Sequence, residues 1–340
     1  MMKQLATIVI AFQLMITSVS ASAPQSNVKK LPDEVRAQQV KDLRFGMFVC
    51  WSFSTFSGQE WTKEVHDASF FKASAYDTNQ WCETAKTSGM NYILFLTKHH
   101  DGFCLWDTKT TDLKVTNSPL GVDVLAQLRK SCDKHGIKLA LYFSEGDWRH
   151  PHSTPEERNR AAEYKKAQLK ELCTQYGPIE FFWMDHAACG DGGLSHIETV
   201  RWIHEFQPNC FVGFNHGQAA GRLCLRERGT PGRLGDSNAS KYNKEAEESY
   251  RGYLVAEFTY PISSTHWFDN PAIKPNSYHS PEKIYKDYVG AVKFGNIFSL
   301  DVGPNRKGKL RDRDINILKR VGEMIRSDNA IQPSTESDKN

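Results

Sequence analysis

The amino-acid sequence predicts an α/β fold, a (β/α)8 TIM-like barrel in which one strand is irregular or hard to recognise. Apolar, β-branched or aromatic runs alternate with helical patterns along almost the whole chain, which is typical of parallel strands joined by crossover helices. Seven such runs occur, so one strand of a barrel is left to be found. The unusual polar residues follow the ends of these runs, and in barrels that rim carries the chemistry.

The predicted strands are apolar on both faces, as expected when helices cover one side and the barrel interior lies on the other. They comprise residues 45–51, 92–97, 139–144, 180–185, 210–214, 254–258 and 296–302. The eighth strand is expected between residues 217 and 253, where no clear run occurs. An open, doubly wound sheet is the alternative, and the placement of the polar residues favours the barrel.

The predicted helices have recognisable capping residues at several of their ends. Asp77 is an N-cap residue, Gly136 suits a helix C-terminus, and Thr154 followed by Pro155 is a typical start. The helices are expected at residues 77–88, 122–135, 154–176, 194–206, 281–294 and 312–326.

The first 23 residues predict a secretory signal peptide. Lys3 supplies the positive charge, an apolar stretch runs over residues 5–16, and Ala-Ser-Ala at residues 21–23 suits the cleavage site. A membrane anchor is the alternative, but the apolar stretch is shorter than the ~20 residues that a bilayer requires. We therefore expect a secreted or periplasmic protein with one catalytic domain over residues 24–330 and a polar C-terminal tail over residues 331–340.

Composition argues against several other classes of protein. The 43 basic and 40 acidic residues are interspersed and leave a formal charge of +3, which favours neither nucleic acid nor a membrane surface as a partner. Eight cysteines are widely spaced without a CxxC pair, so neither a redox motif nor a zinc ribbon is indicated. An oxidising compartment permits disulfides, but most of these cysteines are expected to be small core residues.

Two adjacent histidines, His99 and His100, follow the second predicted strand. Successive side chains of a strand point to opposite faces, so both cannot be ordinary core residues. Together they suit the binding of a polyhydroxylated ligand, with Phe103 and Trp106 offering apolar faces. A structural role and a metal site are the alternatives. The metal hypothesis is weaker because catalytic zinc takes three protein ligands and neither HExxH nor HxH occurs.

A carboxylate, Asp185, ends the apolar run over residues 181–185. A charge at the edge of a water-poor core is costly unless it is paired or used. As a nucleophile Asp185 would attack the anomeric carbon of a sugar, and as a structural residue it would cap the following turn. The pattern alone leaves both open. Trp183 is either a wall beside the sugar or a core residue.

Taken together, the motifs resemble those of the retaining α-L-fucosidases. An early Phe-Gly-Met-Phe-x-x-Trp is followed by Glu-Trp, then Lys-His-His-Asp-Gly-Phe, Trp-x-Asp, and finally Leu-Asp-Val-Gly-Pro-x-x-x-Gly. Their order is specific to the family, and the resemblance covers roughly residues 40 to 327. It corresponds to the catalytic barrel alone, without the C-terminal β-sandwich that is common in the family.

The resemblance implies a role for each matching residue. Asp185 is implied to be the nucleophile, and the acid/base is a glutamate roughly forty residues later in the chain. Glu227 is the first candidate and Glu257 the second. The implied sugar-binding residues are Glu60, Trp61, His99, His100, Tyr142 and Trp183.

The implied reaction is exo-acting release of terminal α-L-fucose from a fucosylated oligosaccharide or glycan by double displacement between two carboxyls. No metal and no organic cofactor is required. A non-catalytic sugar-binding barrel and a glycosidase for a fucose-like sugar are alternatives. A third is a metal-dependent hydrolase built on His99, His100, His186 and His216.

Three positions depart from the family pattern. Cys50 stands where histidine is usual, and Ser52 where glycine is usual. The usual Asn-Asp-Arg after the fifth strand is Asn-His-Gly at residues 215–217, which leaves Arg222 or Arg226 to replace the arginine. These departures affect the expected sugar contacts more than the reaction class.

Overall fold

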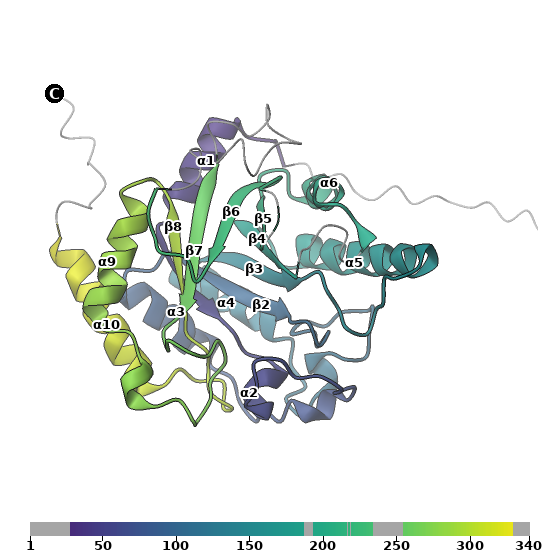
Figure 1. Cartoon of the computed structure of the whole chain (residues 1–340), viewed down its shortest axis with the longest axis horizontal. Coiled ribbons are helices and arrows are strands. Elements are labelled where there is room, and N and C mark those ends of the chain that lie inside the picture. The colour runs from purple at the N-terminus through teal and green to yellow at the C-terminus, as the bar shows by residue number, and fades with distance from the viewer. Residues whose placement is uncertain (1–27, 187–192, 216, 218, 234–253, 329–340) are drawn as a thin grey trace, which may run out of the picture.

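The computed structural model describes residues 28–186, 193–215, 217, 219–233 and 254–328. Within this part of the chain, eight parallel strands close into a barrel in the order β1 to β8, and helices surround it (Figure 1). Strands β1 and β8 complete the barrel by pairing Phe45 with Phe298. The predicted barrel is therefore confirmed, and the open doubly wound sheet is wrong.

The strands are β1 (Phe45–Val49), β2 (Tyr92–Lys98), β3 (Lys138–Ser144), β4 (Phe181–Asp185), β5 (Phe211–Phe214), β6 (Arg222–Glu227), β7 (Val255–Pro261) and β8 (Ile297–Asp301). The described helices are α1 (Asp33–Lys41), α2 (Phe53–Ser57), α3 (Thr78–Thr87), α4 (Val124–His135), α5 (Pro155–Gln175), α6 (His196–Phe206), α9 (Pro281–Val292) and α10 (Asp312–Ser327). Short 3-10 helices are η1 (Ala68–Phe70), η2 (Val115–Asn117) and η5 (Pro275–Ser277).

All seven predicted strands and all six predicted helices are present, with ends that differ by a few residues. The missing strand is β6, which lies inside the interval where it was expected. The helices α1 and α2 were not predicted. The predicted signal peptide and the polar tail lie outside the described residues.

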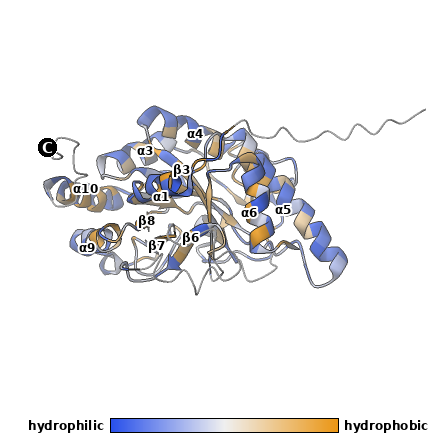
Figure 2. Cartoon of the chain, turned by 90° about the horizontal axis from the view of Figure 1, so that it is seen from above, coloured by the Kyte–Doolittle hydropathy of each residue, from blue (hydrophilic) through white to orange (hydrophobic). Residues whose placement is uncertain are grey.

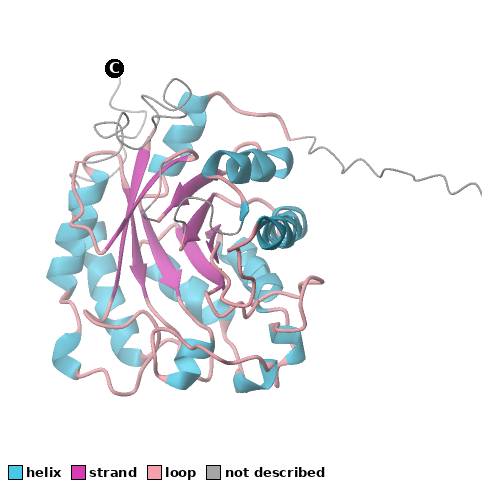
Figure 3. Cartoon of the chain, turned by 45° about the vertical axis from the view of Figure 1, so that its right-hand side comes forward, coloured by secondary structure: helices cyan, strands magenta, loops and turns pink. Residues whose placement is uncertain are grey.

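Burial on both faces explains why the strands are so apolar. Every residue of β1, β2, β7 and β8 is buried. Hydrophobic strands lie between helices that are largely hydrophilic (Figure 2), and these helices ring the sheet (Figure 3). Transfer of this apolar surface out of water is the main term that stabilises the barrel.

Capping residues fix where helices begin and end, as α5 and α4 show. In α5 the Thr154 side chain accepts from the Glu157 amide, and the Glu157 carboxylate accepts in return from the Thr154 amide. At the end of α4, Gly136 has φ of +66°, a conformation that glycine adopts without a side-chain clash. These turns deliver successive parallel strands, so that their carboxyl ends meet at one rim.

None of the helices described is both long and apolar enough to cross a membrane. Seven of the cysteines lie in the described part of the chain, and all seven are buried and free, so the core prediction is confirmed for them. Cys82 of α3 and Cys132 of α4 are neighbours, with sulfur atoms 3.8 Å apart.

Candidate active site

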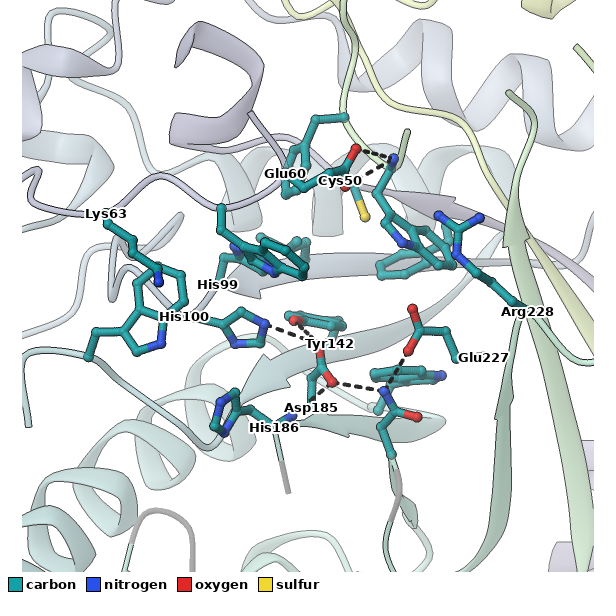
Figure 4. Close-up of a pocket in the computed structure, with 18 residues that line it drawn as sticks. Cys50, Glu60, Lys63, His99, His100, Tyr142, Asp185, His186, Glu227 and Arg228 are labelled. Atoms are coloured by element: carbon teal, nitrogen blue, oxygen red, sulfur yellow. Dashed lines mark hydrogen bonds and ion pairs between the residues drawn. The ribbon is translucent and has the colours of Figure 1, made fainter. Parts of the chain in front are cut away.

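A cavity of about 590 Å³ opens among residues at the carboxyl ends of the strands. Its lining includes both predicted catalytic residues and all six predicted sugar-binding residues (Figure 4). They are Glu60, Trp61, His99, His100, Tyr142, Trp183, Asp185 and Glu227. Residues that are up to 167 positions apart in the sequence thus share one cavity. Their roles in catalysis and binding stay predictions.

Asp185 ends β4 and is held from three directions. The Tyr142 hydroxyl donates to Oδ2 at 2.5 Å, the Asn215 amide donates to Oδ1 at 2.9 Å, and the His186 backbone N–H donates to Oδ1 at 2.8 Å. His100 Nε2 lies 3.7 Å from Oδ2. These contacts give the carboxylate one orientation toward the cavity, as an attacking group requires.

Glu227 ends β6 and lies beside Asp185. One nitrogen of Asn215 donates to Asp185 Oδ1 at 2.9 Å and to Glu227 Oε2 at 2.8 Å. Because both oxygens bond to the same nitrogen, they are separated by less than about 6 Å. Retaining glycosidases have carboxyls about 5–5.5 Å apart, whereas inverting enzymes leave room for water at about 6.5–9.5 Å.

The chain turns sharply after both of these carboxylates. His186 has φ of 50° and Arg228 has φ of 51°, and both residues line the cavity. Non-glycine residues seldom adopt this left-handed conformation, and such residues cluster at functional sites. The turn after Glu227 brings the Arg228 guanidinium over the Trp267 ring at 5.0 Å from its centre.

Glu257, the second candidate for the acid/base, does not line the cavity. It is fully buried in β7, and its Oε2 accepts from the indole N–H of Trp183 at 2.9 Å. Burial, with a smaller contribution from nearby Glu227, raises the pKa of Glu257 to about 7. Trp183 lines the cavity, so Glu257 supports a wall of the site from behind.

The two histidines both lie at the cavity, as expected from their adjacency. Burial lowers the pKa of His100 to about 4 and the pKa of His99 well below its ordinary value, so both rings are neutral near pH 7. His100 Nδ1 bonds to the Ser144 hydroxyl at 2.6 Å. Neutral imidazoles both donate and accept hydrogen bonds, as sugar hydroxyls do.

Glu60 and Cys50 lie across the cavity from Asp185 and Glu227 (Figure 4). Burial raises the pKa of Glu60, although its carboxylate accepts from the Trp267 backbone N–H at 3.1 Å. The Cys50 thiol bonds to Asp301, and burial raises the pKa of that thiol well above its ordinary value. Cys50 therefore presents a neutral thiol to the cavity. Trp61 is 60% exposed and lies at the mouth.

Some cavity residues were given no role from the sequence. They are Phe48, Lys63, Leu96, Trp148, Asn215, Arg228, Trp267 and Phe268. His186 also lines the cavity and was considered only as a metal ligand. His186 and Asn215 follow predicted strands, and this position could have indicated that they face the cavity. Trp267, Phe268 and Lys63 lie in loops where no motif indicates them.

The two arginines considered as replacements do not line the cavity, so that prediction is wrong. Arg222 is buried at the start of β6, where it bonds to Asp33 and stacks on Phe211 at 4.4 Å. Among the described residues, the arginine that lines the cavity is Arg228, which directly follows Glu227.

The metal hypothesis finds no ligand set in the described residues. Within these ranges, no three His, Cys, Asp or Glu side chains are arranged to hold a metal ion. The His100 ring lies 4.1 Å from the His99 ring and 5.1 Å from the His186 ring, measured between centres. His216 lies outside the described residues.

Comparison with known proteins gives a consistent result. A family model described as Alpha-L-fucosidase matches residues 13–329. Alpha-L-fucosidase 1 of Arabidopsis thaliana is 31% identical over 303 residues, which are 83% of this chain and 58% of that protein. This chain therefore spans somewhat less than three fifths of that relative's length.

Solved structures show the same similarity. Alpha-L-fucosidase isoenzyme 1 from Paenibacillus thiaminolyticus has a TM-score of 0.71 and 27% identity, over 89% of this chain and 79% of that one. A glycoside hydrolase 29 family member from an unknown rumen bacterium has a TM-score of 0.69 and 26% identity, over 87% of this chain and 56% of that one.

Proposed function

The chain belongs to the α-L-fucosidase family, and on that premise we propose that it is an exo-acting, retaining hydrolase of terminal α-L-fucosides. The proposal is supported chiefly by the distance between Asp185 and Glu227. Both accept from one nitrogen of Asn215, and the resulting separation suits a retaining mechanism and leaves little room for the water of an inverting one.

In the proposed first step, Asp185 attacks the anomeric carbon while Glu227 gives its proton to the departing glycosidic oxygen. The bond to the aglycone breaks, and a glycosyl ester forms on Asp185. In the second step Glu227 takes a proton from water, which attacks the same carbon and frees Asp185. Two inversions return the original configuration, and no cofactor takes part.

Binding of the sugar is assigned to the remaining predicted residues. His99 and His100 are neutral and face the cavity, so they exchange hydrogen bonds with hydroxyls without the desolvation cost of a charge. Trp183 stacks on Tyr142 with ring centres 5.4 Å apart and provides an apolar wall. Glu60 accepts from hydroxyls on the opposite side of the cavity.

We propose a fucosylated oligosaccharide or glycan as the substrate. A solved α-L-fucosidase with the same fold, 20% identical to this chain, is described in complex with Fuca(1,6)GlcNAc. That disaccharide is a suitable first probe of linkage. We also propose that residues 1–23 direct export to the periplasm or medium, which N-terminal sequencing of the exported protein tests: the first residue should be Pro24.

The proposed activity is tested with purified protein and 4-nitrophenyl α-L-fucoside. Release of nitrophenol, with α-fucose as the first anomer in the proton NMR spectrum, is the expected result. β-Fucose as the first product would overturn the retaining mechanism. Binding of fucose without turnover of any α-L-fucoside would instead identify a sugar-binding barrel. Equal rates with and without a chelator are expected.

A further inference from the structure

Beyond the two carboxyls themselves, we infer that Asn215 is a positioning residue that sets their separation and determines which oxygen of Glu227 carries the proton. This inference rests on the proposed double displacement. It concerns a residue to which the family resemblance assigned no role.

The backbone holds Asn215 in place independently of its side chain. The residue directly follows β5, is only 3% exposed, and donates its backbone N–H to the Met184 carbonyl of β4 at 2.8 Å. Since β4 ends at Asp185, β6 ends at Glu227 and β5 lies between these strands, Asn215 lies at the strand end between the two carboxyl groups. Any movement of its side chain therefore acts on both.

The side-chain amide is suited to bridge two carboxyls. Its Nδ2 carries two hydrogens, and the bonds to Asp185 Oδ1 at 2.9 Å and Glu227 Oε2 at 2.8 Å use both. The amide is neutral at every pH, so it holds two acidic groups together without adding a charge. A carboxylate at the same place would repel both of them.

The bridge also determines the position of the acidic proton. Glu227 Oε2 accepts from Asn215, so in the acid form the proton belongs on Oε1. Oε1 is then the atom that gives the proton to the departing oxygen. After that transfer, the bond from Asn215 supports the ionised Glu227 that must act as the base.

Asn215→Asp and Asn215→Ala test these two functions, and Asn296→Asp is the matched control. Asn296 is also a buried asparagine whose amide bonds twice, to the Ala256 N–H and the Gly232 carbonyl, but it is absent from the cavity. The same chemical change there should lower the melting temperature and leave the pH profile of kcat/KM unmoved.

In Asn215→Asp, three carboxyls share one site, so both limbs of the pH profile of kcat/KM should move to higher pH. In Asn215→Ala, the carboxyls lose their common donor, and kcat/KM should fall by about 100-fold, the size of effect that follows from misplacing a reacting group by ~1 Å. The loss should be larger for aryl fucosides with poor leaving groups.

An unmoved pH profile in Asn215→Asp, with kcat/KM within tenfold of wild type in both variants, would overturn the inference. A second measurement does not depend on turnover. In wild-type protein, the ¹⁵N–¹H side-chain resonances of Asn215 should change with pH, and Glu227→Gln and Asp185→Asn should each reduce that change. Failure of the wild type to hydrolyse any α-L-fucoside would count against the proposed function instead, and the NMR titration would still decide whether Asn215 bonds to Glu227.

Discussion

The indole N–H of Trp183 donates to Oε2 of Glu257 at 2.9 Å. The carboxyl is fully buried, and the indole that it holds forms a wall of the cavity. A buried carboxyl with a pKa near 7 is typical of a general acid. Glu257 has such a pKa, but the indole of Trp183 separates it from the cavity. Geometry therefore favours Glu227, which lines the cavity, over Glu257 for the proposed acid/base role.

Glu227→Ala and Glu257→Gln should differ in their response to azide. Glu227→Ala should slow substrates with poor leaving groups far more than activated ones, and azide should restore turnover and give α-L-fucosyl azide. Glu257→Gln keeps an acceptor for Trp183 and should respond to azide no more than wild type. For both variants, the rates and products with and without azide are measured on one aryl fucoside with a poor leaving group and one with an activated leaving group. Azide rescue of Glu257→Gln alone would reverse the assignment.

The buried carboxyl of Glu257 should also make stability depend on pH. Its pKa is about 7 in the fold and near 4.5 when exposed, so its protonated form stabilises the folded state at low pH. That contribution, about 3 kcal/mol by the size of the shift, is lost as the pH rises from 4.5 to 7. The melting temperature of Glu257→Gln should therefore rise relative to that of wild type as the pH increases over this interval. If the melting temperatures of the two proteins changed in parallel with pH, the raised pKa of Glu257 would be contradicted.

Asp185→Gly should remove nearly all turnover of activated aryl fucosides, because glycine has no carboxylate that could form the glycosyl ester. Each tenfold loss is ~1.4 kcal/mol of barrier, and loss of a nucleophile should cost several kcal/mol. Azide should restore turnover and give the inverted β-L-fucosyl azide. A variant with more than about a tenth of the wild-type rate, and a normal melting temperature, would disprove the role.

Cys50→His tests how far the sugar contacts follow the family. If the natural sugar is fucose, the imidazole should add one neutral hydrogen bond, worth about 0.5–1.5 kcal/mol and so up to about tenfold in kcat/KM. Loss of the thiol bond to buried Asp301 opposes part of this gain. Cys50→Ser, which keeps a donor for Asp301, is the control. A fall in kcat/KM at an unchanged melting temperature would indicate a different sugar.

Cys82 and Cys132 should form a disulfide when the protein folds in an oxidising compartment. Their sulfur atoms are 3.8 Å apart on neighbouring helices, and the bond would close a loop of 50 residues. The two thiols lose their protons and two electrons to oxidised glutathione by exchange. Loop closure predicts a stabilisation of about 4 kcal/mol, so the melting temperature should fall in Cys82→Ser. Peptide maps showing only free thiols after oxidative refolding would contradict this.

Much of the fold was predictable because the strands of a barrel are buried and are therefore visible in the sequence as short apolar runs. Strands covered on both faces are largely apolar, so seven of them were visible as short runs. The strand β6 escaped because it begins with Arg222 and ends with Arg226 and Glu227, which interrupt the apolar pattern. Glu227, at this polar end, lines the cavity.

The sequence by itself determined which residue types are available for the chemistry and in what order they follow the strands. His99, His100 and Asp185 follow or end apolar runs, and such positions meet at one rim in any parallel barrel. This local information indicated these three residues, and the family resemblance supplied Glu60, Trp61, Tyr142, Trp183 and Glu227, which line the same cavity.

Only the tertiary structure decided how these groups act on one another. Asn215 bridges Asp185 and Glu227 because β4, β5 and β6 are neighbours in the barrel, and Glu257 does not line the cavity because its side chain lies behind Trp183. The position of a residue in the sequence shows at the end of which strand it lies. It does not record the distance between two side chains on different strands, and the packing of those side chains decides that Glu227 faces the cavity while Glu257 lies behind Trp183.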